Sequence, residues 1–182
     1  MNIIGERVVL RAIEEKDLIY LKEIINDPDS EKCVLGWSKP VSTTQQEEWF
    51  KKIDNENSDI RFAVESANQF IGTCILSNID WKNRCVGINI KLLEQYRKNG
   101  YGKECIQILV KYCYEEINMN RIEANILEYN IASQKLFEKC GFTLEGKKRS
   151  AIYKNNKYND VRIYSLLKEE YSKNEEYKIG DR

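Results

Sequence analysis

The sequence predicts an α/β (α+β) domain with a mixed central β-sheet, and two periodicities in its apolar residues support this prediction. Residues Ile88, Ile90 and Leu92 alternate with their neighbours, which is typical of a half-buried strand. From Ile106 to Ile117 the apolar residues recur at a period near 3.6, which is typical of an amphipathic helix. Segments of the two kinds follow one another along the chain, so we expect helices packed on the faces of one sheet.

The first half of the chain is expected to hold a strand, two helices and two further strands. Strand 8–12 precedes helix 14–26, which ends before Pro28. Residues 27–41 form a loop or a broken helix. The run Thr-Gln-Gln-Glu at 44–47 fits a capping box that opens the second helix. Strands 60–65 and 70–79 follow, joined by a tight turn at 66–69.

The second half begins with the central strand at Val86. A helix at 103–116, a strand at 121–128 and a short helix at 133–139, closed by Gly141, come next. A hairpin of strands 142–153 and 158–167 turns at Asn155 and Asn156, because asparagine tolerates positive φ. The predicted order is β-α-α-β-β-β-α-β-α-β-β.

Composition sets the broad class of the protein. A chain of 182 residues is expected to form one domain, placed at 1–170 and followed by a charged tail at 171–182 that frays. Basic and acidic residues number 29 each, so nucleic acid is not an expected partner. No apolar run is long enough to span a bilayer, and the six cysteines show no C-x-x-C spacing, so we expect a cytoplasmic protein with reduced thiols. The absence of histidine argues against zinc and against Ser-His or Cys-His catalysis, and no metal is expected.

A glycine-bearing turn lies between the central strand and the next helix. It reads Arg97-Lys98-Asn99-Gly100-Tyr101-Gly102 and is followed by Lys103. The first N–H groups of a helix lack intrahelical acceptors, and the helix dipole is positive there, so such a turn can bind phosphate. A purely geometric role for the glycines is the alternative. The P-loop and the dinucleotide fingerprint do not fit, because no Gly-Lys-Ser/Thr follows and the third glycine is missing.

A second motif follows downstream, with Asn130, Ser133, Leu136, Phe137, Lys139 and Gly141-Phe142 at fixed spacing. The two motifs together resemble those of the GNAT superfamily of acyl-CoA-dependent N-acetyltransferases. Residues 6–12 and 145–167 resemble the RimJ/RimL-like branch, whose members acetylate protein N-termini. Spermidine-type acetyltransferases share much of this pattern. The resemblance implies the GNAT fold, whose central parallel strands splay to admit acetyl-CoA.

The resemblance also implies roles for particular residues. The turn from Arg97 to Lys103 would bind the pyrophosphate of CoA, and Leu92 would bind the pantetheine arm and the thioester carbonyl through its backbone. Asn130, Ser133, Phe137 and Lys139 would line the arm, with Ser133 a candidate proton donor to the leaving thiolate. The amine would attack the thioester directly in a ternary complex.

The sequence departs from the family pattern where acid–base groups are common. Phe137 stands where many members have a tyrosine, Gly87 where a glutamate is common, and Ile152 where some members have a carboxylate. No general base is therefore assigned. Glu128, Tyr129 and Tyr153 are nearby substitutes for which a structural role is the stronger interpretation.

The segment between the first two helices is the candidate acceptor site. The residues Asp27, Asp29, Glu31 and Trp37 lie there, and carboxylates would attract a cationic amine. A merely solvated loop is the alternative. The expected acceptor is a peptide N-terminus or a small amine such as a polyamine or an aminoglycoside. A CoA-binding protein without catalysis is the alternative of another class, and a homodimer is left open.

Overall fold

The computed structural model of the chain describes residues 1–36, 39–53 and 59–172. Its strands are β1 (Ile3–Ile4), β2 (Val9–Arg11), β3 (Ile60–Ser66), β4 (Gln69–Asp80), β5 (Cys85–Leu92), β6 (Arg121–Leu127), β7 (Thr143–Lys154) and β8 (Lys157–Leu167). Its helices are α1 (Leu18–Asn26), α2 (Pro28–Cys33), α3 (Thr43–Lys52), α4 (Tyr101–Glu115) and α5 (Ile131–Lys139). Short 3₁₀ turns precede α1 at Glu15–Asp17 and α4 at Glu94–Tyr96. Within the described residues, no helix is long and apolar enough to cross a membrane.

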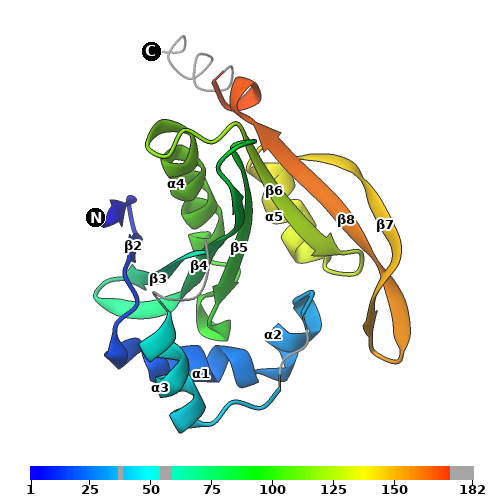
Figure 1. Cartoon of the computed structure of the whole chain (residues 1–182). Helices are drawn as coiled ribbons and strands as arrows, with labels where there is room; N and C mark the ends of the chain where they lie inside the picture. Colours follow the sequence, from blue (N-terminus) through cyan, green and yellow to red (C-terminus); the bar gives the residue numbers. More distant parts are fainter. Residues whose placement is uncertain (37–38, 54–58, 173–182) are drawn as a thin grey trace.

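The strands form one eight-stranded sheet in the order β1-β2-β3-β4-β5-β6-β8-β7 (Figure 1). Its described neighbours pair antiparallel except β5 and β6, which pair parallel. The predicted mixed sheet is therefore confirmed. The expected element order is also found, with two additions: the short strand β1, and the helix α2 inside the segment expected to be a loop or broken helix.

The two faces of the sheet are covered by different helices, and alternation along β3 shows this directly. Phe62 and Val64 belong to the apolar cluster that includes α4 and Phe137 of α5, whereas Ala63 packs with Leu21 and the rest of the α1 cluster. Successive strand residues point to opposite faces. Helices α4 and α5 therefore lie on one face, and α1 and α3 on the other.

The predicted turn between β7 and β8 is confirmed. Asn155 and Asn156 have φ of 52° and 63° in the β7–β8 turn, as the hairpin requires.

The predicted position of the capping box of α3 is wrong. Ser42 rather than Thr44 is the N-cap, because its hydroxyl accepts from Gln45 N at 3.2 Å while Gln45 Oε1 accepts from Ser42 N at 2.9 Å.

The predicted tail boundary also needs correction at its first residues. Residues 168–172 are helical, and the ring of Tyr171 lies 5.2 Å from that of Tyr114 while its hydroxyl donates to Glu115 Oε1 at 2.9 Å. Tyr171 is thus packed against the core rather than frayed. Residues 173–182, the rest of the predicted tail, lie outside the described residues.

Candidate active site

The central parallel strands separate soon after they meet. Pairing between β5 and β6 is recorded only for Cys85–Gly87 with Arg121–Glu123, within the part of the chain the structure describes. Beyond Gly87, β5 continues along β4 to Leu92, while β6 continues along β8 to Leu127. The two strands therefore splay, and the β6-facing edge of β5 is open from Ile88 onward.

Leu92 presents backbone groups to this splay. Leu93 N donates to Ile71 O of β4 at 3.0 Å. Because residues on an antiparallel strand alternate in the side to which their N–H and C=O point, those of Leu92 point away from β4, towards β6. Leu92 O accepts from Arg97 Nε at 2.9 Å. The Leu92 N–H is therefore placed to donate to a carbonyl lying between the strands.

The start of α4 is a second set of backbone donors at the same end of β5. Its N-cap is Gly100, whose φ of 86° is left-handed and favours glycine, and no side chain caps the helix. Lys98 also has a positive φ, of 63°. Lys103 N donates to Gly100 O at 3.1 Å, so it is the N–H groups of Tyr101 and Gly102 that remain available to an anion.

A residue that sequence reasoning missed, Arg7, lies beside this turn. Its Nη1 donates to Asn99 O at 3.2 Å, and its guanidinium lies 4.8 Å from the centre of the Tyr101 ring. Its Nε also pairs with Glu104 Oε2 at 3.0 Å. Arg7 and Glu104 are 97 positions apart in the sequence, so no local pattern could have indicated their contact.

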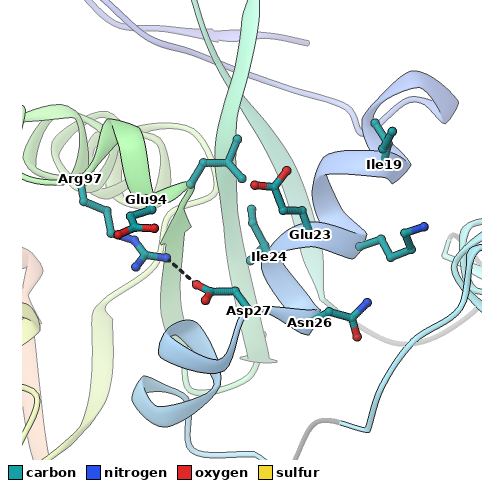
Figure 2. A pocket seen from close by; sticks show the side chains of 9 residues that line it. Ile19, Glu23, Ile24, Asn26, Asp27, Glu94 and Arg97 are labelled. Carbon is teal, nitrogen blue, oxygen red and sulfur yellow. Dashed lines mark hydrogen bonds and ion pairs between the residues drawn. The ribbon is translucent and has the colours of Figure 1, made fainter.

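Arg97 does not add its charge to the turn as expected. Its guanidinium points towards the start of α2, where Nη2 donates to Asp27 Oδ2 at 3.2 Å (Figure 2). The same Nη2 donates to Ser30 Oγ at 2.8 Å. Within the turn itself, Lys98 and Lys103 are exposed and carry positive charge. An open cavity of about 550 Å³ lies between α1 and this region, lined by Ile19, Glu23 and Leu93 among others, and Arg97 borders it.

Gly102 is buried, and its role in the structure is packing. An added Cβ would lie 3.2 Å from Leu136 Cδ2 of α5 and 3.8 Å from Leu92 Cδ1 of β5. The glycine therefore lets α4 approach both α5 and β5. Packing is therefore a second role for Gly102, beside the approach of phosphate that the resemblance predicted.

Helix α5 begins on the opposite wall of the splay, after β6. Asn130 is its N-cap, and the Asn130 Oδ1 accepts from Ser133 N at 3.2 Å. Ser133 is half-buried in the first turn. Phe137 is 4% exposed and packs edge-on against Phe142 at 5.0 Å, so it belongs to the core, whereas Lys139 is exposed.

Helix α2 crosses the open end of the splay and is held from both sides. Arg97, which follows β5, contacts Asp27 and Ser30, and Tyr129, which follows β6, donates its hydroxyl to Lys32 O. Lys154, at the end of β7, donates to the Glu31 main-chain oxygen at 2.8 Å. Figure 1 shows α2 between α1 and the tip of the β7–β8 hairpin.

The three predicted acceptor carboxylates are each paired with a cation. Asp27 pairs with Arg97, Asp29 with Lys32 at 2.8 Å, and Glu31 with Lys154 at 2.6 Å. Asp27 is also the N-cap of α2. Burial alone would raise its pKa, but hydrogen bonds from Ser30, from the Asp29 N–H and from Arg97 outweigh burial and lower the pKa to about 2. Trp37, the fourth predicted residue, lies outside the described residues.

The nearby substitutes for an acid or base all have structural partners. Glu128 Oε1 accepts from Arg162 at 3.3 Å, and the Tyr153 hydroxyl donates to Asn156 at 2.9 Å. Tyr129 contacts α2, and burial raises its pKa. Gly87 stands where a glutamate is common in the family. A side chain at this position would contact Ser77, since an added Cβ would lie 3.1 Å from Ser77 Oγ. The structural interpretation of these residues is the one that the contacts support.

Comparison with known proteins agrees with this geometry. Residues 7–143 match the Acetyltransferase (GNAT) domain family. The chain is 30% identical over 171 residues to the SPbeta prophage-derived uncharacterized N-acetyltransferase YokL of Bacillus subtilis, covering 93% of this chain and 95% of that protein. It is 25% identical to the spermidine N(1)-acetyltransferase of Vibrio cholerae over 92% of this chain and 96% of that protein.

A solved structure shows the same fold. The crystal structure of spermidine N-acetyltransferase from Vibrio cholerae in complex with CoA and spermine superposes with a TM-score of 0.84 at 26% identity, over 92% of this chain and 99% of that one. The mixed sheet of this chain, with its one parallel pair among the described strands, thus agrees with the GNAT fold that the resemblance predicted. The chain therefore belongs to the GNAT acetyltransferase family and is a CoA-dependent N-acetyltransferase.

Proposed function

We propose that the protein transfers the acetyl group of acetyl-CoA to a primary amine by direct attack in a ternary complex. The observation that carries the proposal is the open edge of β5 at Leu92, flanked by the uncapped start of α4 and the start of α5. When bound, acetyl-CoA supplies a thioester whose acetyl group passes to the amine, so that an amide bond forms as the carbon–sulfur bond breaks and the amine proton ends on the thiol.

The residues of this chain fit that substrate. The N–H groups at the start of α4 lie next to a left-handed Gly100 and the exposed Lys98 and Lys103, which suits a pyrophosphate. The Leu92 N–H would hold the thioester carbonyl and stabilise negative charge as it develops there. Asn130 and Ser133 would lie beside the pantetheine arm, with the Ser133 hydroxyl donating to the departing sulfur. Phe137 would support α5 from the core.

Positioning is expected to supply most of the catalysis. Glu128, Tyr129 and Tyr153 are engaged in other contacts, and Phe137 has no proton to give. The proposal therefore assigns the proton of the ammonium form to solvent, and assigns to the protein the alignment of amine and thioester. Such alignment is worth roughly 7–11 kcal/mol of barrier in favourable cases.

The acceptor class is tested by measuring thiol release from acetyl-CoA with N-terminal peptides, polyamines, aminoglycosides and amino acids. We expect at least one primary amine to be acetylated. Ser133→Ala should lower turnover by more than it weakens CoA binding in calorimetry, because the hydroxyl acts on the leaving sulfur. If none of the amines in the panel causes thiol release, the acetyl transfer is contradicted. Equal turnover of wild type and Ser133→Ala at saturating acetyl-CoA would contradict the role of the Ser133 hydroxyl.

A further inference from the structure

Lys91 is a cation beside the reacting position that the sequence motifs do not include. It directly precedes Leu92 in β5 and pairs in register with Thr73 of β4. The side chains of Ile90 and Leu92 pack on the α4 face, so Lys91 points to the opposite face, which α1 and α3 cover. In the proposed acetyl transfer, with pyrophosphate at the start of α4, an amine would reach the thioester from this second face.

The surroundings of Lys91 are mixed in charge and shielded from water. Lys91 is half-buried. Burial lowers its pKa, Glu31 raises it, and Arg61 and Lys154 lower it, so one carboxylate and two cations lie within electrostatic range. Arg61 has its own partner, since its Nη2 lies 2.9 Å from Asp59 Oδ2.

Glu31 offers an oxygen that the protein leaves without a partner. Its Oε1 accepts from Lys154 Nζ at 2.6 Å, and the Lys154 side chain is only 10% exposed. Its Oε2 is buried and has no hydrogen-bond partner among the described residues. Leaving such an acceptor unpaired costs free energy, and a ligand N–H that reached this oxygen would recover that cost.

The charges of α2 and of Lys91 do not suit a second cationic group of a ligand at this position. The three carboxylates of α2 and its N-cap are matched by Arg97, Lys32 and Lys154, and Lys91 adds a further cation. A second ammonium group on a ligand would meet Lys91 and Lys154 in a partly desolvated site, where like charges repel strongly. A carboxylate in the same place would instead pair with Lys91.

We propose that the acceptor is a small primary amine that also carries a carboxylate, with the carboxylate bound by Lys91 and an amine N–H received by Oε2 of Glu31. The inference rests on the proposed acetyl transfer and narrows its substrate class. It also predicts that this protein differs in acceptor from the spermidine acetyltransferases that share its fold.

The test compares amines that differ by one charge. Thiol release from acetyl-CoA is measured with a set of amino acids, with their carboxamides and with spermidine. We expect kcat/KM for the carboxylates to exceed that for the matched carboxamides by about tenfold or more, the scale of one well-placed charge pair. A wild-type preference for carboxamides or for spermidine would overturn the inference. If none of the tested amines causes thiol release, the result would instead count against the proposed acetyl transfer itself.

Variants of Lys91 locate the effect. Lys91→Met should bring the carboxylate-to-carboxamide ratio close to one, while Lys91→Arg keeps a preference because it keeps the charge. Lys82→Met, at an exposed lysine in the β4–β5 turn, is the matched control and should leave the ratio unchanged. An unchanged ratio in a Lys91→Met protein that melts as the wild type does would refute the role of Lys91.

A binding measurement gives a readout that does not depend on turnover. The N-acetylated amino acid retains the carboxylate, so its affinity for the CoA-loaded protein can be followed by calorimetry. We expect Lys91→Met to weaken it about tenfold or more and Lys91→Arg to weaken it less. Equal affinity for wild type and Lys91→Met would contradict the carboxylate contact.

Discussion

At the scale of single residues, Gly102 illustrates how a motif glycine can serve packing. The distance of 3.2 Å from its missing Cβ to Leu136 is tighter than an ordinary contact. Gly102→Val should therefore lower the free energy of unfolding by about 1–3 kcal/mol, as overpacking does. Urea unfolding would measure this, with Gly146→Ala as control, because nothing lies within 4 Å of an added Cβ there. Unchanged stability of Gly102→Val would show that α5 can give way.

Asp27 gives a pH-dependent prediction. Its pKa of about 2 in the folded protein lies below the ordinary 3.8, so its contribution to stability is present above about pH 4 and is lost as the pH falls towards 2. Asp27→Ala should cost about 1–2 kcal/mol at pH 6, through the lost cap of α2, and less at pH 3. Denaturant unfolding at both pH values measures the difference.

Asp29→Ala is the matched control for Asp27→Ala. Its ion pair with Lys32 is exposed, and such pairs contribute little to stability. We expect a small effect that is similar at both pH values. A cost for Asp27→Ala that stayed the same from pH 6 to pH 3 would contradict the assigned pKa.

At the scale of elements, α5 is held by its aromatic contacts with the core. Phe137 lies edge-on to Phe142 and is almost fully buried. Phe137→Tyr, which would install the tyrosine common in the family, should lower the melting temperature, because a buried hydroxyl without a partner costs about 1–3 kcal/mol. It should not raise turnover. A folded Phe137→Tyr protein with faster thiol release would contradict this prediction and show that the hydroxyl reaches the splay. Phe137→Met is the control for a change in packing alone.

Helix α2 shows which parts of an element can be read from sequence. Pro28 and the acidic residues around it are visible in the sequence, but a helix of six residues has too little periodicity to be predicted. Its position depends on Arg97, Tyr129 and Lys154, which come from three distant parts of the chain. The carboxylates that were predicted to attract an amine are mostly occupied in holding this helix.

At the scale of the whole molecule, the sequence predicted the mixed sheet, and the two segments proposed to bind the cofactor both border the splay. Strands and turns were predictable because alternation, glycine and asparagine are local signals, as the β7–β8 turn shows. Charge partners were not, since Arg7 with Glu104 and Lys154 with Glu31 meet only in the folded chain. Lys91 was overlooked for the same reason, because its significance depends on neighbours from α2 and β7.

The splay between β5 and β6 also has a consequence for hydrogen exchange. Leu93 N donates to Ile71 O, so alternation places the N–H groups of Lys91 and Leu93 in the β4 ladder and those of Ile90 and Leu92 on the open edge. Deuterium uptake along this part of β5 should therefore alternate, fast at Ile90 and Leu92 and slow at Lys91 and Leu93. Saturating acetyl-CoA should slow uptake at the fast positions and abolish the alternation. A single strand would then report, amide by amide, whether the cofactor has completed the sheet.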